Sequence, residues 1–208
     1  QRVTHDPREI TNDGFWAVSI SFEGQWTCAQ FDEVVDAQFI TSDSDFVSSK
    51  FKSSMDRDTY ISYVHAIQED VSNGWVYQVN ACRRLSIKSN ARLDLAFANI
   101  LAANPAPFAS YLKFGDIEIA SASPELFLTR NGDELKTSPI KGTKRSATEK
   151  FGTKDRAENV MIVDLMRNDF GRICEPGSVD VSQLLRSEEH PGLRHLVSDV
   201  VGELRKDI

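Results

Sequence analysis

Three pairs of β-rich runs, each joined by a short turn that contains glycine, restrict the folds that this chain can adopt. The runs flank Glu23-Gly24, Gly115-Asp116 and Asn131-Gly132. Runs joined by so short a turn can pair only as antiparallel hairpins, because parallel strands need a long crossover connection. Helical segments occur between the hairpins, without a regular alternation of strand and helix. The pattern therefore predicts an α+β fold and argues against a doubly wound parallel sheet.

Two segments of the first half have the apolar spacing of amphipathic helices. The first covers residues 60–71 and is expected to end at Asn73-Gly74, because these residue types tolerate the left-handed conformation at a helix C-terminus. The second covers residues 93–101, and Asn104-Pro105 ends it.

A third and longer helix is predicted in the second half of the chain. We expect Thr153 to be its N-cap, Asn168 to lie near its end and Gly171 to supply the residue after it. Glu158 then lies at the rim of a stripe that faces the core. The residues of this stripe are Met161, Ile162 and Leu165.

Four further segments complete the expected organisation. Alternating residues predict one long strand over 75–87 and another over 193–203. Residues 42–56 are rich in Ser, Asp and Lys and are expected to form a loop. Residues 1–12 carry no periodic signal and are expected to be a loose or partly ordered lead-in.

The composition excludes several classes of function. A net charge of −7 argues against a nucleic-acid-binding protein, because no basic stripe is available to displace phosphate counterions. An anionic ligand would need local positive charge from a metal ion or from placed Lys and Arg residues. No apolar run approaches the ~18 residues of a membrane span. Cys28, Cys82 and Cys174 form no C-x-x-C pair, so we expect reduced core cysteines in a cytoplasmic protein, without a zinc site.

Four residues in the second half are candidates for chemistry. Lys141 stands between an isoleucine and a glycine, a setting that could shield its amine, although a lone lysine at such a place is more often solvated. A nucleophilic lysine must be neutral, whereas a free lysine is protonated at pH 7. Glu125 and Glu158 could act as an acid or a metal ligand, or serve only as an ion-pair partner and a helix N-terminal carboxylate. His195 could be catalytic or a satisfied core histidine.

Four motifs in one order resemble those of the chorismate-utilising enzymes. They are S-P-E (123–125), P-I-K-G-T (139–143), K-D-x-A-E-N-x-M-I-V-D-L-x-R-N-D (154–169) and H-L-V-S-x-V-x-G-E-L (195–204). This family includes anthranilate synthase component I, aminodeoxychorismate synthase component I, isochorismate synthase and salicylate synthase. The resemblance implies the layered α+β fold of these enzymes and chorismate as the substrate.

The lysine in P-I-K-G-T is typical of the aminodeoxychorismate synthase (PabB-type) branch, which serves p-aminobenzoate and folate biosynthesis. The resemblance implies that Lys141 attacks chorismate at C2 and expels the C4 hydroxyl, with Glu125 as the general acid. Ammonia then attacks C4 and expels the lysine, so that one poor displacement becomes two easier ones. The same resemblance implies that Glu158 binds Mg²⁺.

Other positions and a partner follow from the same resemblance. Gly142 and Thr143 match positions that bind the substrate, and His195 matches a catalytic position. The family would also bring a glutamine amidotransferase subunit or domain (PabA-type) that delivers ammonia, and no motif for that activity is present in this sequence.

The resemblance also carries expectations about the extent of the chain. Family members continue with a G-A-P-K segment and a second magnesium-binding glutamate, which this sequence lacks, and it begins without methionine. We therefore expect residues 1–208 to be the N-terminal portion of a chorismate-binding domain, with the remainder absent. Two alternatives stay open: anthranilate synthase component I, and a non-catalytic chorismate-binding fragment.

Overall fold

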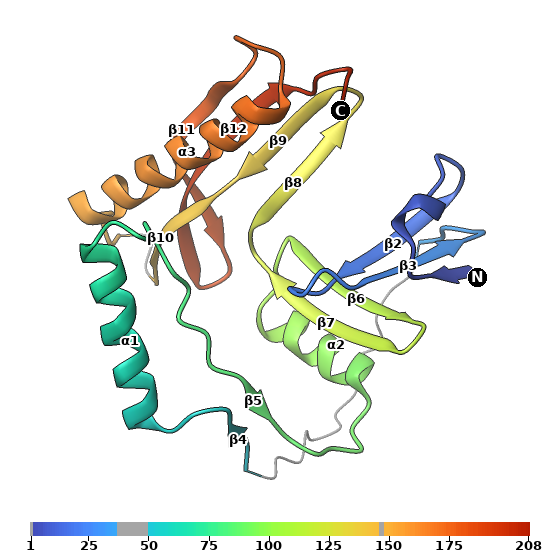
Figure 1. Cartoon of the computed structure of the whole chain (residues 1–208). Coiled ribbons are helices and arrows are strands. Elements are labelled where there is room, and N and C mark those ends of the chain that lie inside the picture. Colours follow the sequence, from blue (N-terminus) through green and yellow to red (C-terminus); the bar gives the residue numbers. More distant parts are fainter. Residues whose placement is uncertain (1, 37–49, 146–147) are drawn as a thin grey trace. The chain divides into compact units, whose positions relative to one another are not determined.

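The computed structural model describes residues 2–36, 50–145 and 148–208, which form two units (Figure 1). The first unit holds residues 2–36, 93–145 and 148–208, and the second holds residues 50–92. Every strand pair in the described residues is antiparallel. The predicted α+β class is therefore confirmed.

The main sheet of the first unit is built around its last strand. Its strands are β8 (Leu126–Asn131), β9 (Glu134–Ser138), β10 (Ile140–Lys144), β11 (Asp180–His190) and β12 (Leu193–Glu203). The order is β10-β12-β9-β8, and β11 also pairs with β12. Because β12 pairs with three other strands, it is the element that positions the rest of the sheet.

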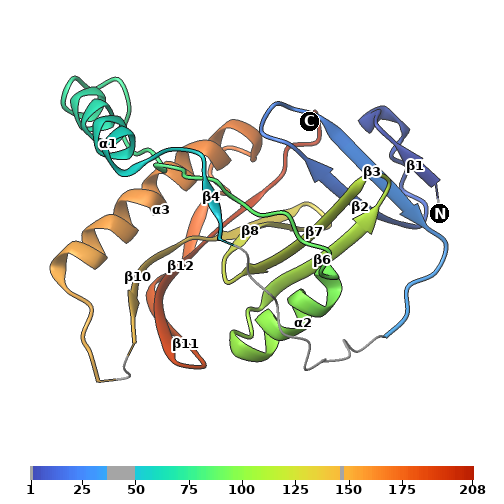
Figure 2. The ribbon, with the colours of Figure 1, turned by 90° about the horizontal axis from the view of Figure 1, so that it is seen from below.

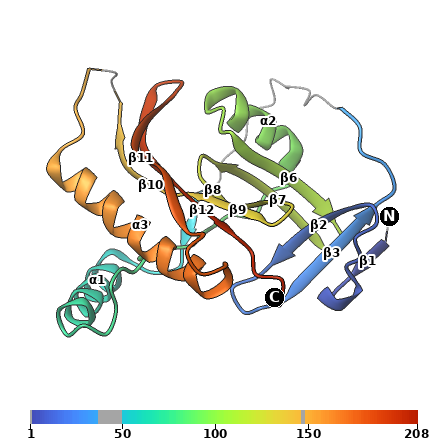
Figure 3. The ribbon, with the colours of Figure 1, turned by 90° about the horizontal axis from the view of Figure 1, so that it is seen from above.

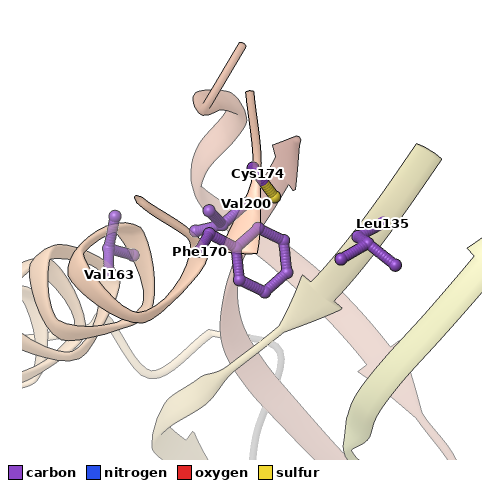
Figure 4. Packing of buried hydrophobic residues seen from close by; sticks show 5 residues of the cluster. All are labelled: Leu135, Val163, Phe170, Cys174 and Val200. Carbon is purple, nitrogen blue, oxygen red and sulfur yellow. The ribbon is translucent and has the colours of Figure 1, made fainter. Parts of the chain in front are cut away.

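Helix α3 (Thr153–Ile173) packs against β10, β11 and β12 and covers the core. Figure 3 shows the helix running beside these strands. In Figure 4 the ring of Phe170 points from this helix toward the sheet. The buried cluster consists of Leu135, Val163, Phe170, Cys174 and Val200. The approach is close at Gly202, where an added Cβ would lie 2.8 Å from Sγ of Cys174, so only glycine fits there.

The ends and the buried face of α3 differ from the prediction. The N-cap is Gly152 instead of Thr153, because the Asp155 carboxylate accepts a hydrogen bond from the Gly152 N–H at 2.8 Å. The helix continues through Gly171 to its C-cap at Cys174. Its buried residues are Asn159, Val163 and Phe170, whereas the predicted stripe of Met161, Ile162 and Leu165 is only half-buried.

The N-terminal part of the first unit is a three-stranded sheet in the order β1-β3-β2. The hairpin of β2 (Phe15–Ile20) and β3 (Trp26–Phe31) confirms its prediction. Residues 2–12 are more ordered than the expected lead-in, since β1 (Arg2–Thr4) pairs with β3 and Pro7–Glu9 form a 3₁₀ turn. The pairing with β3 orders this segment. A short segment without periodicity gives no indication of such pairing in its own sequence.

A further hairpin is covered by a helix, as predicted. Strands β6 (Phe108–Phe114) and β7 (Ile117–Ser123) pair along their whole length, and α2 (Leu93–Ala103) lies beside them in Figure 2. Phe97 of α2 is 1% exposed and stacks on Tyr111 of β6, with ring centroids 5.9 Å apart. This stacking anchors the helix on the hairpin.

The second unit contains α1 (Arg57–Ser72) and the short strand pair of β4 (Lys52–Ser53) and β5 (Leu85–Ser86). The helix ends as predicted, with Asn73 as its C-cap and Gly74 at φ +75°. Part of the predicted loop over 42–56, residues 42–49, lies outside the described residues.

The long strand predicted over residues 75–87 is wrong. Only Leu85–Ser86 pair with another strand, while Trp75 and Tyr77 are 79% and 62% exposed. Alternating residues favour a strand only where a neighbouring strand offers its backbone groups, and within this unit β4 offers two residues.

The predicted strand over 193–203 is confirmed as β12, whereas β11 was not predicted. Cys28 and Cys174 are buried as expected, but Cys82 is exposed. Among the described residues, none of the helices combines the length and the apolar character needed to cross a membrane.

Candidate active site

Strand β10 carries three of the candidate residues beside the central strand β12. Ile140 pairs with Val197 and Thr143 pairs with His195, and the register shifts between these two pairs. The irregularity falls on the stretch that contains Lys141, and such irregularities redirect a side chain relative to a regular strand. Lys141 is half-buried.

Gly142 allows α3 to approach β10. Its φ is +85°, and an added Cβ would lie 2.9 Å from Cβ of Asp155. Both the backbone conformation and the space therefore require glycine at this position. The close neighbour that the glycine admits is the helix, and a contact of Gly142 with the substrate stays a prediction.

Thr143 and His195 are joined across the strand pair. Oγ1 of Thr143 lies 3.0 Å from Nδ1 of His195, within hydrogen-bond distance. His195 is only 6% exposed. Burial lowers the pKa of His195, and the nearby His190 lowers it further. The ring is therefore favoured in its neutral form, in which it has one donor and one acceptor nitrogen.

Glu125 is tied to the same strand from the loop between β7 and β8. Its Oε1 accepts a hydrogen bond of 2.7 Å from the backbone N–H of Ile140, the residue before Lys141. The side chain of Ser123 contacts both the backbone N–H and the carbonyl of Glu125. The fold thus joins Glu125 to Ile140, which is 15 positions later in the sequence.

The lysines of β9 and β10 differ in their partners. Lys144 lies 3.2 Å from Asp155 and 3.5 Å from Glu149, and its hydrogen bond to Asp155 raises its pKa. Lys136 lies 2.9 Å from Asp199. For Lys141, no ion pair occurs with any residue that the structure describes.

Glu158 lies on α3, one turn after Asp155 and on the same side of the helix. Its side chain is 44% exposed and lies 3.7 Å from the exposed Lys154. Such an exposed pair is weak, so the carboxylate is available to another cation. In the described ranges no three His, Cys, Asp or Glu side chains form a ready metal site. A single carboxylate still fits Mg²⁺, which keeps several water ligands.

The neighbour of Glu158, Asn159, locks α3 onto the sheet. Asn159 is fully buried; its Nδ2 donates to the Leu196 carbonyl at 3.0 Å, and its Oδ1 accepts from the Ser198 hydroxyl at 2.5 Å. Ser198 Oγ also accepts from the backbone N–H of Leu185. This network was not predicted from the sequence, although a polar residue at a core position of a helix was a signal for it.

A second polar network on the sheet was also missed. Arg186 of β11 bonds to Glu188 and lies 3.3 Å from Asp199, which also binds Lys136. Burial tends to raise the pKa of Asp199, but hydrogen bonds from Lys136, Ser138 and Arg186 outweigh it and lower the pKa. Arg186 lies on β11, a strand that was not predicted, so the network could not be inferred from the sequence.

Two hollows lie near these residues. A small cleft of about 140 Å³ is bordered by Pro124 and Leu126, the neighbours of Glu125, and by Ile140 and Arg186. A larger hollow of about 730 Å³ lies between α3 and β11 and is lined by none of the six candidate residues. None of the six candidate residues lines either of these two hollows.

The structure brings together five of the six predicted residues: Glu125, Lys141, Gly142, Thr143 and His195 are linked through β10 and β12. Glu158 lies on the helix that packs on β10, and within the described residues no hydrogen bond or ion pair joins it to the other five. The fold thus places the amine of Lys141 on β10, the imidazole of His195 on the neighbouring β12 and the carboxylate of Glu125 in the loop before β8. A second carboxylate, that of Glu158, lies on α3.

Comparison with known proteins gives a family match over most of the chain. A family model described as chorismate binding enzyme matches residues 21–208. The chain is 36% identical to aminodeoxychorismate synthase component 1 of Escherichia coli (strain K12), over 84% of this chain and 41% of that protein. It is also 36% identical to an anthranilate synthase component 1 of Haloarcula marismortui, over 74% of this chain and 34% of that protein.

Solved structures give the same picture. Anthranilate synthase component I from Streptococcus pneumoniae TIGR4 superposes with a TM-score of 0.69 at 27% identity, over 84% of this chain and 40% of that chain. A putative isochorismate synthase from Bacillus anthracis, 15% identical with a TM-score of 0.64, shares the fold. The chain spans about 40% of the length of the curated relative from Escherichia coli.

Proposed function

The chain belongs to the family of chorismate binding enzymes, and we propose that it carries the lysine-bearing part of an aminodeoxychorismate synthase component 1. Such an enzyme converts chorismate and ammonia to 4-amino-4-deoxychorismate. The observation that supports this reaction most is the setting of Lys141. It is half-buried, has no ion pair among the described residues, and follows the residue whose N–H binds Glu125.

In the proposed reaction the neutral amine of Lys141 forms a bond to C2 of chorismate. Both conjugated double bonds of the ring shift, the C4–O bond breaks, and the hydroxyl leaves as water with a proton from Glu125. Ammonia then forms a bond to C4, both double bonds shift back, and the bond between C2 and the lysine nitrogen breaks. The lysine returns to its neutral state after the excess proton leaves.

The other candidate residues have supporting roles in this proposal. The backbone N–H of Ile140 orients the Glu125 carboxyl toward the strand that carries Lys141. Thr143 would orient the ring of His195 through the contact between Oγ1 and Nδ1. In this proposal both residues face the six-membered ring and the carboxylates of the substrate. Mg²⁺, held by Glu158, would supply positive charge for a substrate carboxylate. This charge matters because the chain itself is acidic, with a net charge of −7.

Ammonia would come from a glutamine amidotransferase partner of the PabA type. Curated relatives of this chain are named component 1, which accords with a second component in the working enzyme. A cytoplasmic location is part of the same proposal, as expected for a biosynthetic enzyme with three free cysteines.

Anthranilate synthase component 1 is the second candidate. Relatives with this name are as similar to the chain as those named aminodeoxychorismate synthase, at 36% identity in each case. The two reactions differ in where the amine enters the ring and in whether the enzyme forms a covalent adduct. The lysine at position 141 favours the adduct, and the products separate the two reactions directly.

The test is mass spectrometry of the intact protein after incubation with chorismate and Mg²⁺ without ammonia. We expect added mass equal to chorismate less one water, located on the peptide that contains Lys141. Lys141→Ala should abolish the adduct, because no other group in the proposal forms the bond. Lys113→Ala is the matched control, since Lys113 is exposed on β6, where it pairs with Glu118.

Calorimetry with chorismate and Mg²⁺ accompanies this measurement. Micromolar binding together with the adduct supports the proposal. Binding without an adduct, and anthranilate on addition of ammonium, would identify the second candidate. A chain that binds chorismate only in the millimolar range or not at all is a non-catalytic fragment, and then the proposed activity does not belong to this chain alone.

A further inference from the structure

The first turn of α3 touches β10 directly after Lys141, through the side chain of Asp155. The residue that follows Lys141 is Gly142, and an added Cβ there would lie 2.9 Å from Cβ and 3.3 Å from Oδ1 of Asp155. The three atoms nearest to that position all belong to Asp155. The Asp155 side chain therefore occupies the space beside the Gly142 backbone that any other residue type would need.

The carboxylate of Asp155 makes two further contacts, both through Oδ2. It accepts a hydrogen bond of 2.8 Å from the backbone N–H of Gly152, just before the helix, and it lies 3.2 Å from Nζ of Lys144. The hydrogen bond from Gly152, together with Lys144, lowers the pKa of Asp155 against the effect of burial, and the contact with Asp155 raises the pKa of Lys144. One carboxylate thus joins β10 to the N-terminus of α3.

The stretch of β10 beside Asp155 is irregular. The register of β10 against β12 shifts between Ile140 and Thr143, so Lys141 and Gly142 have no partner in the regular register. Gly142 has φ +85°, and glycine can adopt many other conformations as readily. Pairing with β12 therefore does not by itself fix the direction of the Lys141 side chain. The contact with Asp155 supplies an additional restraint at this point.

We propose that Asp155 is a positioning residue for Lys141. Its side chain packs on Gly142 and its carboxylate binds Lys144, so the irregular stretch of β10 is held against α3 at two points. The same helix carries Glu158 one turn later, which ties the lysine and Glu158 to one element. The role of Asp155 in the reaction rests on the proposed function, whereas the positioning of Lys141 rests only on these contacts.

The alternative is that the carboxylate serves only to cap α3 through Gly152. The cap requires an acceptor oxygen, whereas the contact with Lys144 requires a negative charge. Asp155→Asn separates the two roles, because the amide has nearly the same size and keeps an acceptor for Gly152 but carries no charge. Lys144→Gln removes the ion pair from the other side and leaves the cap intact.

Arg156→Gln is the matched control. Arg156 follows Asp155 on the helix and is exposed, and its replacement removes one positive charge, as Lys144→Gln does. Within residues 50–145 and 148–208, no hydrogen bond or ion pair joins the Arg156 side chain to β10. An effect of net charge alone would therefore be the same in Arg156→Gln and Lys144→Gln.

The experiment compares how fast the lysine amines react with a trace amount of the N-hydroxysuccinimide ester of acetic acid. Peptide mass spectrometry gives the acetylation of Lys141 relative to that of Lys113, which is exposed on β6. Without the restraint, the half-buried Lys141 reaches solvent more often. We expect the ratio to rise roughly two- to fivefold in both Asp155→Asn and Lys144→Gln, as for the loss of a partly exposed ion pair. The ratio should stay unchanged in Arg156→Gln.

A change in the same direction in the two variants identifies positioning. If Asp155 and Lys144 acted on Lys141 only through their charges, removal of the carboxylate would increase the neutral, reactive fraction of the amine, and removal of the ammonium would decrease it. Opposite changes, a change in one folded variant only, or no change in either would overturn the proposal. Should Asp155→Asn not fold, Lys144→Gln still decides, because a rise supports the restraint and a fall or no change contradicts it.

Formation of the chorismate adduct is measured separately on the same samples. A misdirected amine reacts more slowly with chorismate, so under the proposed function the adduct should form more slowly in the two variants although acetylation is faster. An unmodified chain that forms no adduct contradicts the proposed function and leaves the acetylation result standing. An adduct in the unmodified chain, with an unchanged acetylation ratio in the variants, contradicts the positioning role of Asp155 alone.

Discussion

The two faces of β12 are both buried but are stabilised in different ways. One face packs on α3 through Val200, and its polar residue, Ser198, is satisfied by Asn159. The other face carries His195 and Asp199, which are 6% and 3% exposed and are surrounded by polar and charged side chains. From one face of the strand to the other, the surroundings change from an apolar core to a buried cluster of polar and charged side chains.

The groups that stabilise the fold thus lie on the α3 face of β12, whereas the candidate groups for chemistry lie on the other face and on β10. On the α3 face, Val200 packs in the core and Ser198 and Asn159 bond to each other. Loss of one of these side chains therefore removes packing or leaves a buried polar group unpaired. On the opposite face His195 contacts the hydroxyl of Thr143, and on β10 Lys141 has no ion pair within the part of the chain that the structure describes. Changes on the first face should lower stability, whereas changes on the second should act mainly on binding and titration.

The largest effect is expected from Phe170→Ala, on the α3 face. Phe170 is 5% exposed in the buried cluster, and truncation of such a ring leaves a cavity that the sheet cannot fill. We expect a loss of about 3–5 kcal/mol in the free energy of unfolding. Urea denaturation followed by fluorescence measures it. A loss below about 1 kcal/mol would mean that the α3 face is not the core of this unit.

A smaller loss is expected from Asn159→Ala, which breaks the polar link between α3 and β12. The Ser198 hydroxyl and the Leu196 carbonyl then lose their partner in a buried site, which costs about 1–3 kcal/mol. Asn168→Ala, at an exposed position of the same helix, is the control and should change stability by less than about 0.5 kcal/mol. If the two variants lost equal amounts of unfolding free energy, the buried hydrogen bonds of Asn159 would not stabilise the contact between α3 and β12.

The smallest effect is expected from Asp199→Asn, on the opposite face. The ion pairs with Lys136 and Arg186 are partly exposed, so we expect a loss of only about 1–2 kcal/mol at pH 7. Because the pKa of Asp199 is lowered in the folded chain, its contribution is present above the ordinary carboxylate pKa of about 4. It is lost as the pH falls through the lower, folded value.

The difference in unfolding free energy between the unmodified chain and Asp199→Asn should therefore shrink on acidification below about pH 4. Denaturation curves at a series of pH values measure this. A difference that stays constant down to the lowest pH at which the chain folds would show that the carboxylate charge makes no contribution.

The elements that the sequence predicted well are those with local signals. Asn131-Gly132 and Gly115-Asp116 join hairpins because short turns with glycine leave little choice of pairing. Asn73-Gly74 ends α1 for a similar local reason. The candidates Glu125, Lys141, Thr143 and His195 came from motifs, and the fold joins them on neighbouring strands.

The failures share a dependence on distant partners. The strand predicted over 75–87 lacks a neighbouring strand along most of its length, and β11 was missed although it pairs along most of β12. On α3, the apolar spacing predicted that Met161, Ile162 and Leu165 face the core, whereas the face that packs on the sheet contains Asn159. A polar residue in the core is stable there only because Leu196 and Ser198 satisfy it.

The sequence alone determined the antiparallel hairpins, the C-terminal ends of α1 and α2 and the family to which the chain belongs, because turn chemistry and motifs are properties of adjacent residues. Only the tertiary structure decided which lysine lacks a carboxylate, which face of α3 is buried and which histidine lies against His195. These outcomes depend on charge, burial and hydrogen bonding between residues far apart in the chain, and such interactions exist only after the strands have paired.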